Sequence, residues 1–220
     1  LQAHGLKHGD AVIVTNYSCP ASLSSVMVAG FEPVFCEINE HGNMDPAHLP
    51  SLMNHKVKAV VATALYGDTH DHDAIKKFCD DNGLVYVNDA AQSQFALCNG
   101  VDSLACGDSV AISFADNKPI PTIGTYGAVL TDNDAVYNMV RVLRKNGKAT
   151  HDEPYLMAGY SSHPEEDKAL QIYATIPHFR KWIDRRVEIG NMYDEAFKGK
   201  MDARTKPAYS KWNGHKYSLF

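Results

Sequence analysis

The sequence predicts a three-layer α/β/α fold built on a mainly parallel, mixed sheet, followed by the start of a small α+β domain. Short runs of β-branched and aromatic residues alternate with longer stretches of helical periodicity, as they do in stacked βα units. The apolar runs are continuous, which is typical of strands buried on both faces. A chain of 220 residues is long enough for one large core, or for one domain and part of a second.

Six strands are expected in one sheet. Runs such as AVIVT and VKAVVAT are rich in valine and are bounded by polar or turn-forming residues. The expected strands are 11–15, 33–38, 57–63, 84–88, 109–114 and 127–131.

Helices are expected between these strands, and one or two more after them. Asp45 and Pro46 form a start signal for the second helix, with a capping carboxylate and a proline in the first turn. Gly83 directly follows AIKKFCDDN and predicts a left-handed end to the third helix. The expected helical ranges are 20–29, 46–54, 70–82, 134–146 and 165–197.

The polar stretch 197–210 separates the last expected helix from HKYSLF, which is expected to form a strand. We therefore expect a cofactor-binding large domain over 1–197 and a stub of a C-terminal small domain over 198–220. The chain begins without methionine and stops within an expected strand. Truncation at both ends is accordingly expected.

Composition argues against several classes of function. The formal net charge is −5, and the basic residues are dispersed except in RKWIDRR at 180–186, so no nucleic-acid partner is expected. That basic run is interpreted as the solvated face of a helix. No apolar run approaches the ~20 residues of a membrane-spanning helix. Five cysteines without a CxxC pair argue against a disulfide framework or a zinc cluster and favour a cytoplasmic location.

Polar groups capable of chemistry follow two expected strands at their carboxyl ends, where parallel sheets bind ligands. Asp89 and Gln92 follow the fourth strand, and Ser113 and Lys118 follow the fifth. An amine, a carboxylate and a hydroxyl suit pyridoxal 5'-phosphate: they would bind its aldehyde, its ring nitrogen and its phosphate. Each residue also has an ordinary explanation, such as a helix cap for Asp89 and an exposed loop lysine for Lys118.

Several segments resemble, in order and spacing, the DegT/DnrJ/StrS family of sugar aminotransferases. The sharpest are NGLVYVNDAAQS and SFADNKPI followed by GTYGAVLTDN, and the resemblance covers roughly residues 3–197. It implies a homodimeric fold-type-I pyridoxal-phosphate enzyme of aminosugar or polysaccharide biosynthesis. Such an enzyme moves an amino group from an amino acid, commonly glutamate, to a nucleotide-linked keto sugar.

The resemblance assigns roles by position. Lys118 would form the Schiff base with the cofactor and would move the proton during transfer. Asp89 would pair with the pyridinium nitrogen, Gln92 would hydrogen-bond the ring hydroxyl and Ser113 would contact the phosphate. The sugar is expected to enter near Tyr66 and the loop after Tyr160.

The sequence also departs from the family pattern. Cys19, two residues beyond Tyr17, stands where the family usually has an aromatic residue that stacks on the cofactor ring. Ser161, in GYSSH, stands where the family has an asparagine that reaches the partner subunit's phosphate, and it is expected to substitute weakly. The family's small-residue turn that cups the phosphate would precede Leu1.

Three alternatives remain open. The chain could be a non-catalytic relic of the same fold. Some relatives carry histidine in place of the lysine and catalyse dehydration, a route that Lys118 disfavours. The run GDTHDHDAI at 67–75 could hold a divalent metal in a metal-dependent α/β enzyme, although its acidic residues also suit a helix start, and no metal is expected.

Overall fold

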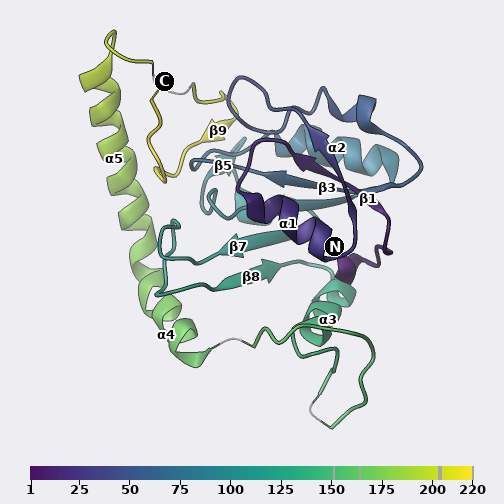
Figure 1. Cartoon of the computed structure of the whole chain (residues 1–220). Helices are drawn as coiled ribbons and strands as arrows, with labels where there is room; N and C mark the ends of the chain where they lie inside the picture. Colours follow the sequence, from purple (N-terminus) through teal and green to yellow (C-terminus); the bar gives the residue numbers. More distant parts are fainter. Residues whose placement is uncertain (151, 164, 203–204, 220) are drawn as a thin grey trace.

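A computed structural model describes residues 1–150, 152–163, 165–202 and 205–219 (Figure 1). Its main sheet has the strand order β2-β1-β3-β4-β7-β8, with β8 antiparallel to β7 and all other neighbours parallel. The strands are β1 (Ala11–Thr15), β2 (Glu32–Cys36), β3 (Val57–Thr63), β4 (Val85–Asp89), β7 (Ser109–Ser113) and β8 (Gly127–Leu130). The prediction of a mainly parallel mixed sheet is confirmed.

Helices cover both faces of this sheet and complete the three layers. Residues of α1 and α3 pack over one face, where Val26 joins a core with Val12 and Val14. On the other face α2 packs over Tyr86, and α5 packs over β7 through Phe179. The helices are α1 (Pro20–Val28), α2 (His72–Asn82), α3 (Asp134–Leu143), α4 (Glu166–Thr175) and α5 (Phe179–Phe197), with 3₁₀ turns η1 (Gln2–His4), η2 (Leu49–Leu52), η3 (Ser103–Ala105) and η4 (Ile176–His178).

The ends of α2 follow the signals in the sequence. The Asp71 side chain accepts a hydrogen bond from the Ala74 backbone N–H at 3.0 Å, which satisfies one open donor of the first turn. Gly83 ends the helix with φ 64° and ψ 34°, the left-handed conformation that glycine adopts without a steric cost. The predicted end of this helix is thus confirmed.

The predicted helix at 46–54 is wrong. Asp45 accepts a hydrogen bond from the Ala47 N–H at 3.0 Å, but the chain then forms only the 3₁₀ turn η2. Pro50 explains the difference, because it has no N–H to donate and its ring disfavours the α conformation of Leu49.

The predicted strand at 215–220 is wrong over 215–218; Leu219 forms a single β-bridge, and residue 220 lies outside the described residues. Residues 212–218 form no strand. Strand β9 (Ser210–Lys211) lies earlier and pairs with β5 (Leu97–Cys98), which also pairs with β6 (Val101–Asp102). The chain then turns at Gly214 (φ 76°), and its Lys216 N–H bonds the Tyr66 carbonyl at 3.2 Å instead of a neighbouring strand.

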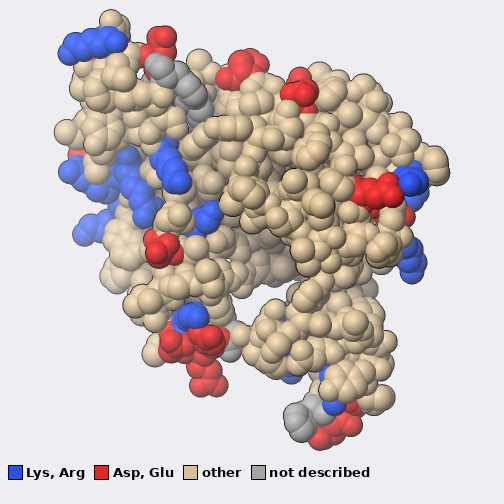
Figure 2. All heavy atoms as spheres, viewed as in Figure 1, with Lys and Arg blue, Asp and Glu red and all other residues tan. Residues whose placement is uncertain are grey.

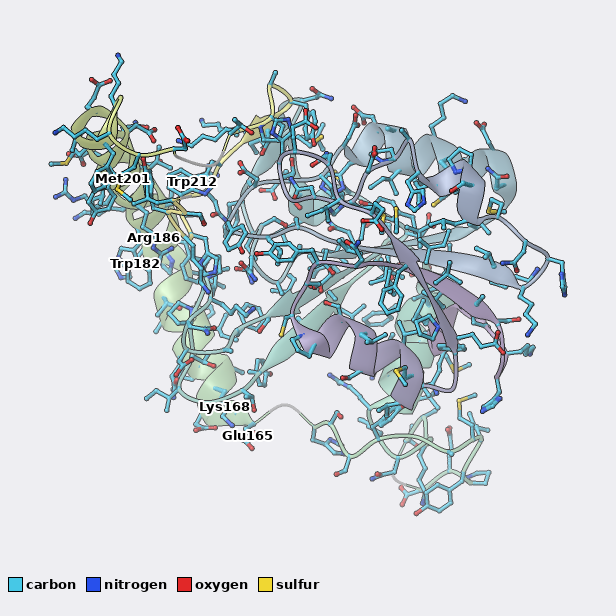
Figure 3. The ribbon with its side chains drawn as sticks, turned by 45° about the horizontal axis from the view of Figure 1, so that its top comes forward. Glu165, Lys168, Trp182, Arg186, Met201 and Trp212 are labelled. Carbon is cyan, nitrogen blue, oxygen red and sulfur yellow. The ribbon has the colours of Figure 1, made fainter. Side chains whose placement is uncertain are left out.

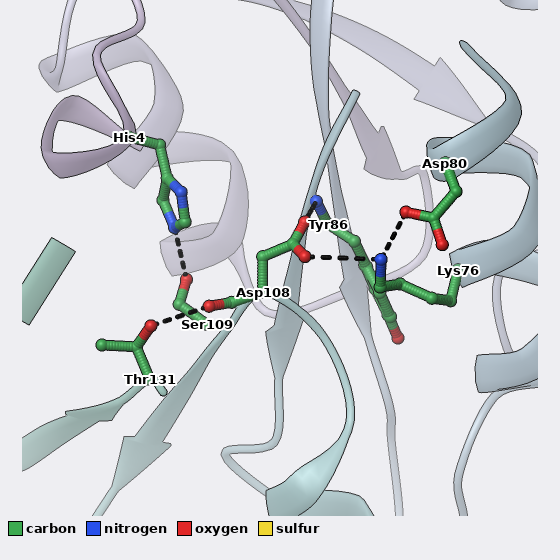
Figure 4. A network of polar contacts seen from close by, with 7 residues as sticks. All are labelled: His4, Lys76, Asp80, Tyr86, Asp108, Ser109 and Thr131. Carbon is green, nitrogen blue, oxygen red and sulfur yellow. Dashed lines mark hydrogen bonds and ion pairs between the residues drawn. The ribbon is translucent and has the colours of Figure 1, made fainter. Parts of the chain in front are cut away.

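A polar network ties the starts of the strands together (Figure 4). The Asp108 carboxylate accepts the Tyr86 N–H at 2.7 Å, and the Asp108 carbonyl accepts the Thr131 hydroxyl at 2.9 Å. Next to Asp108 in the chain, Ser109 Oγ lies 3.0 Å from His4 Nε2, and this contact joins η1 to β7. This network fixes the edge of the sheet opposite the carboxyl ends.

Asp108→Ala should therefore lower the free energy of unfolding by about 1–3 kcal/mol, because the partly buried Tyr86 N–H loses its acceptor. Urea unfolding of the variant measures the change. Asp81→Ala is the matched control, because Asp81 forms an exposed ion pair with Lys77 on α2, and it should cost less than about 1 kcal/mol. Equal losses in both variants would contradict this role of Asp108.

Among the described residues, no helix combines the length and the apolar character needed to cross a bilayer.

Candidate active site

Asp89 ends β4 at the carboxyl edge of the sheet, directly opposite Thr63 in β3. Its Oδ2 accepts hydrogen bonds from Ser22 Oγ at 3.1 Å and Thr63 Oγ1 at 3.2 Å, and its Oδ1 accepts the Ala91 N–H at 3.1 Å. Donors from α1, β3 and the turn after β4 therefore hold the carboxylate in one orientation. A carboxylate has about four acceptor positions, so it can accept one more donor.

A cavity of about 260 Å³ lies beside this carboxylate, between the sheet, α1 and α3. Side chains alternate along a strand, so Asp89 points to the same face as Val87, which lines the cavity. Ser113 lies two residues beyond Ala111, another lining residue, and therefore points to this face of β7. Asp89 and Ser113 thus lie on one face at the carboxyl ends of adjacent strands.

Lys118 lies in the loop after β7. Its N–H bonds the Ala115 carbonyl at 3.0 Å, and Thr122 folds the loop back by donating from its N–H and its hydroxyl to the Phe114 carbonyl, at 2.8 and 2.9 Å. Lys118 is half-buried. Figure 1 shows β3 and β7 pointing toward α5, so this loop lies at the same edge as Asp89.

Gln92 holds a strained turn beside the site. Its Oε1 accepts the N–H of Tyr66 at 2.9 Å. Tyr66 has φ 61°, which is costly for a bulky residue, and its carbonyl accepts the Trp212 indole N–H at 2.7 Å. The Tyr66 hydroxyl lies 2.6 Å from that of Tyr17. Sequence reasoning named Tyr66 only as a neighbour of the substrate entrance, and nothing in the sequence revealed this strain.

Cys19 lies just before α1, on the same edge as Tyr17. Its thiol is exposed, and its side chain forms no hydrogen bond that caps the helix. The structure therefore leaves Cys19 accessible at the carboxyl edge, where β1 ends.

Ser161 is not brought to this edge within one chain. It forms an isolated bridge with Lys145, and its neighbour Tyr160 donates a hydrogen bond to Gln2 in η1 at 3.0 Å. Because η1 contacts the start of β7 through His4, Ser161 lies toward the opposite end of the strands from Asp89.

The histidines of the GDTHDHDAI run belong to the core. His70 Nε2 and His72 Nδ1 lie 2.5 and 2.6 Å from the buried Tyr86 hydroxyl, and His72 Nε2 lies 3.3 Å from Ser103 Oγ. Three of the four ring nitrogens thus lie within hydrogen-bond distance of protein hydroxyls, which disfavours the two histidines as metal ligands. The ligand atoms of Asp71, Asp73 and Cys98 lie within 4.8 Å of one another, but Asp71 caps α2 and Asp73 accepts a hydrogen bond from Asn99 at 2.7 Å.

This histidine pair predicts acid sensitivity. Burial lowers the pKa of His72 to about 4, and burial together with His72 lowers the pKa of His70 well below its ordinary value. The unfolded chain protonates these rings near pH 6.5, whereas the folded chain does not, so stability falls as the pH drops from about 6.5 toward 4.

Urea unfolding between pH 7 and pH 4.5 should show a decrease of at most about 1.4 kcal/mol per pH unit for each histidine. His72→Gln should flatten this dependence, while His55→Gln, at an exposed position, should leave it unchanged. Identical slopes for the wild type and His72→Gln would show that His72 does not cause it.

The fold of this chain is that of solved aminotransferase structures. The structure of S. venezuelae DesV in complex with a ketimine intermediate superposes with a TM-score of 0.94 at 26% identity, covering 99% of this chain and 59% of that one. A DegT DnrJ EryC1 StrS aminotransferase from Brucella abortus shares the fold, with a TM-score of 0.92 at 24% identity, covering 99% of this chain and 61% of that one.

The family follows from the sequence match. The model of the DegT/DnrJ/EryC1/StrS aminotransferase family matches residues 1–220, and the chain belongs to this family, as the resemblance predicted.

Two curated relatives illustrate the match. A pleiotropic regulatory protein of Geobacillus stearothermophilus is 33% identical over 187 residues, which are 84% of this chain and 50% of the relative. The dTDP-3-amino-3,4,6-trideoxy-alpha-D-glucose transaminase of Streptomyces venezuelae is 31% identical over 198 residues, 88% of this chain and 51% of the relative. The chain thus spans about half the length of these relatives.

Proposed function

We propose that the protein carrying this chain is a pyridoxal-phosphate-dependent aminotransferase that transfers an amino group from glutamate to a nucleotide-linked keto sugar. Family membership supports the reaction class, and the Streptomyces relative is named as a transaminase of a dTDP-linked sugar. The single observation that carries the proposal is the fixed Asp89 carboxylate at the sheet edge that also bears Lys118 and Ser113.

The donor set fits the cofactor. Asp89 would accept a hydrogen bond from the ring nitrogen, because one of its acceptor positions remains after Ser22, Thr63 and Ala91 have donated. Ser113 would contact the phosphate. Gln92 uses Oε1 for Tyr66, so its Nε2 would donate to the ring hydroxyl. Cys19 would lie against the ring face, where the thiol gives less contact area than an aromatic ring.

The chain's own residues would perform two tasks. The bound cofactor supplies an electron sink for the reacting carbon. The Lys118 amine would hold the aldehyde carbon, and after release it would carry a proton between the two carbons that flank the transferred nitrogen. Asp89 would remain ionised and so keep the ring nitrogen protonated.

The remaining assignments complete the proposal. Ser161 lies away from Asp89 in its own chain, so its contact with cofactor phosphate would be made in a second copy, as a homodimer. Residues 1–197 would form the cofactor-binding domain and 198–220 the start of a small domain. The enzyme would act in the cytoplasm, in aminosugar or polysaccharide biosynthesis.

An amino-transfer assay tests this function. The protein is incubated with pyridoxal phosphate, glutamate and a panel of UDP-, dTDP- and GDP-linked keto sugars, and amino-sugar formation is followed by mass spectrometry. We expect one sugar to be aminated, with formation of 2-oxoglutarate. Cofactor binding without turnover for any sugar or amino donor would contradict the proposal and favour a non-catalytic relic.

A further inference from the structure

The C-terminal segment 212–216 is fixed between the turn after β3 and helix α5. Trp212 donates its indole N–H to the Tyr66 carbonyl at 2.7 Å, and the Asn213 N–H donates to the Gly67 carbonyl at 2.9 Å. A Cβ added to Gly214 would lie 2.5 Å from the Cβ of Arg186. Figure 3 shows Trp212 and Arg186 close together where this segment meets α5.

His215 lies at the centre of this junction. A Cβ added to Gly67 would lie 2.9 Å from the Cβ of His215, so the histidine abuts the Tyr66–Gly67 turn on one side. Gly214, its neighbour, abuts Arg186 on the other side. His215 is therefore fixed between the edge of the candidate site and α5.

Positive charge gathers around this histidine. Arg186 is half-buried and donates from Nη1 to the carbonyl of Pro119, the residue after Lys118, at 3.2 Å. The pKa of His215 is lowered to about 3. Burial is the largest cause, and the positive charges of Lys216, Lys118 and Arg186 lower it further. Figure 2 shows Lys and Arg side chains over α5 on this side of the molecule.

These cations have no acidic partner in the part of the chain that the structure describes. Carboxylates form ion pairs with Lys168, Arg185 and Lys206, but none does so with Lys118, Arg186 or Lys216. A partly buried guanidinium without a counter-charge is costly, and a bound anion would offset that cost.

A pocket of about 190 Å³ opens at the same place. Arg186 and His215 both line it, together with the rings of Tyr193, Trp212 and Tyr217. The pocket thus has room for a small anionic group and presents one fixed cation and one imidazole to it.

We propose that Arg186 and His215 line a binding site for an oxyanion carried by a substrate, either the carboxylate of the amino donor or a phosphate of the nucleotide sugar, and that Lys216, outside the pocket lining, adds positive charge beside it. This inference rests on the proposed function, because it assigns the anion to that reaction. Arg186 would bind the oxyanion through its remaining guanidinium N–H groups, and Lys216 would add charge. His215 would donate one N–H and would be more easily protonated with the anion bound.

Binding of inorganic phosphate and of succinate to the cofactor-loaded protein tests the site by calorimetry. Arg186→Gln and Lys216→Gln should each weaken binding of one or both probes about tenfold, and Arg186→Lys should restore part of it. Arg185→Gln is the matched control, because Arg185 is the adjacent arginine on α5 and pairs with Glu188 at an exposed position. It should bind both probes as the wild type does.

Steady-state kinetics distinguish the two sources of the anion. If the site binds the donor carboxylate, Arg186→Gln raises the KM for glutamate and leaves the KM for the sugar nucleotide unchanged. If the site binds a phosphate, Arg186→Gln raises the KM for the sugar nucleotide and leaves the KM for glutamate unchanged. Either split supports the site.

Unchanged binding of both probes in Arg186→Gln and in Lys216→Gln would overturn the inference. Should Arg186→Gln fail to fold, two other measurements test the site. Binding of both probes to the exposed Lys216→Gln variant is measured as above, and the pKa of His215 is measured by NMR titration with and without the anion. The anion should raise the pKa of His215, and an unchanged pKa would overturn the site. A protein that binds phosphate through Arg186, but shows no cofactor bound to Lys118, would instead contradict the proposed function and leave the oxyanion site intact.

Discussion

Lys118→Ala should reduce amino transfer by roughly 10²–10⁴-fold, the range that a positioned proton-transfer group contributes. The variant loses the amine that would hold the cofactor aldehyde and the base that would carry the proton. The yellow absorbance of the cofactor-loaded protein should shift to that of the unattached cofactor. Absorbance spectra and turnover with the accepted sugar nucleotide measure both effects.

Lys77→Ala controls for the loss of a lysine. Lys77 is exposed on α2 and pairs with Asp81, far from the loop after β7 in the chain. It should retain wild-type turnover and spectrum. If Lys118→Ala kept most of its activity while Lys77→Ala behaved as the wild type, another group would have to move the proton.

Asp89→Asn should reduce turnover by roughly 10²–10³-fold, comparable to the loss of one preorganised electrostatic contact in an active site. Asparagine keeps the shape of the side chain, so the hydroxyls of Ser22 and Thr63 still have a partner. The negative charge is lost, and the ring nitrogen is no longer held in its protonated form. The experiment measures kcat and the affinity for pyridoxal phosphate.

Asp116→Asn is the control for this charge, because Asp116 is an exposed carboxylate two residues before Lys118. It should change neither kcat nor the cofactor affinity by more than a small factor. A wild-type kcat in Asp89→Asn would show that the carboxylate does not bind the ring nitrogen.

The sheet could be predicted from the sequence because its strands are buried on both faces. Continuous apolar runs such as 57–63 and 11–15 show no helical periodicity, so the sequence pattern favours strands over helices there. Both strands are observed at those residues. The cap at Gly83 was predictable because its conformation depends on one local residue. The helix predicted at 46–54 does not form because Pro50 interrupts it, despite the start signal at Asp45 and Pro46.

Features that depend on contacts between distant residues could not be predicted. The pairing of β9 with β5 joins residues more than 110 positions apart, and no local pattern encodes it. Arg186 was grouped with the exposed basic run 180–186, yet it is half-buried. Helical spacing places it on the same side of α5 as the buried Ile183 and Gly190, and only the position of the C-terminal segment shows what covers that side.

The candidate site was predictable in its residue types and less so in its geometry. The sequence indicated that Asp89, Gln92, Ser113 and Lys118 follow neighbouring strands, which the strand order bears out. It did not indicate that Ser22 and Thr63 orient the carboxylate, because their hydroxyls come from α1 and β3. The roles of these residues toward the cofactor remain predictions.

The central claim is that Lys118 and Asp89 bind opposite ends of one pyridoxal phosphate. Borohydride reduction of the cofactor-loaded protein, followed by mass mapping of its peptides, tests it most directly. We predict a phosphopyridoxyl group on Lys118, formed less readily in Asp89→Asn. Labelling of a different lysine, or no labelling of a protein that binds the cofactor, would contradict the claim.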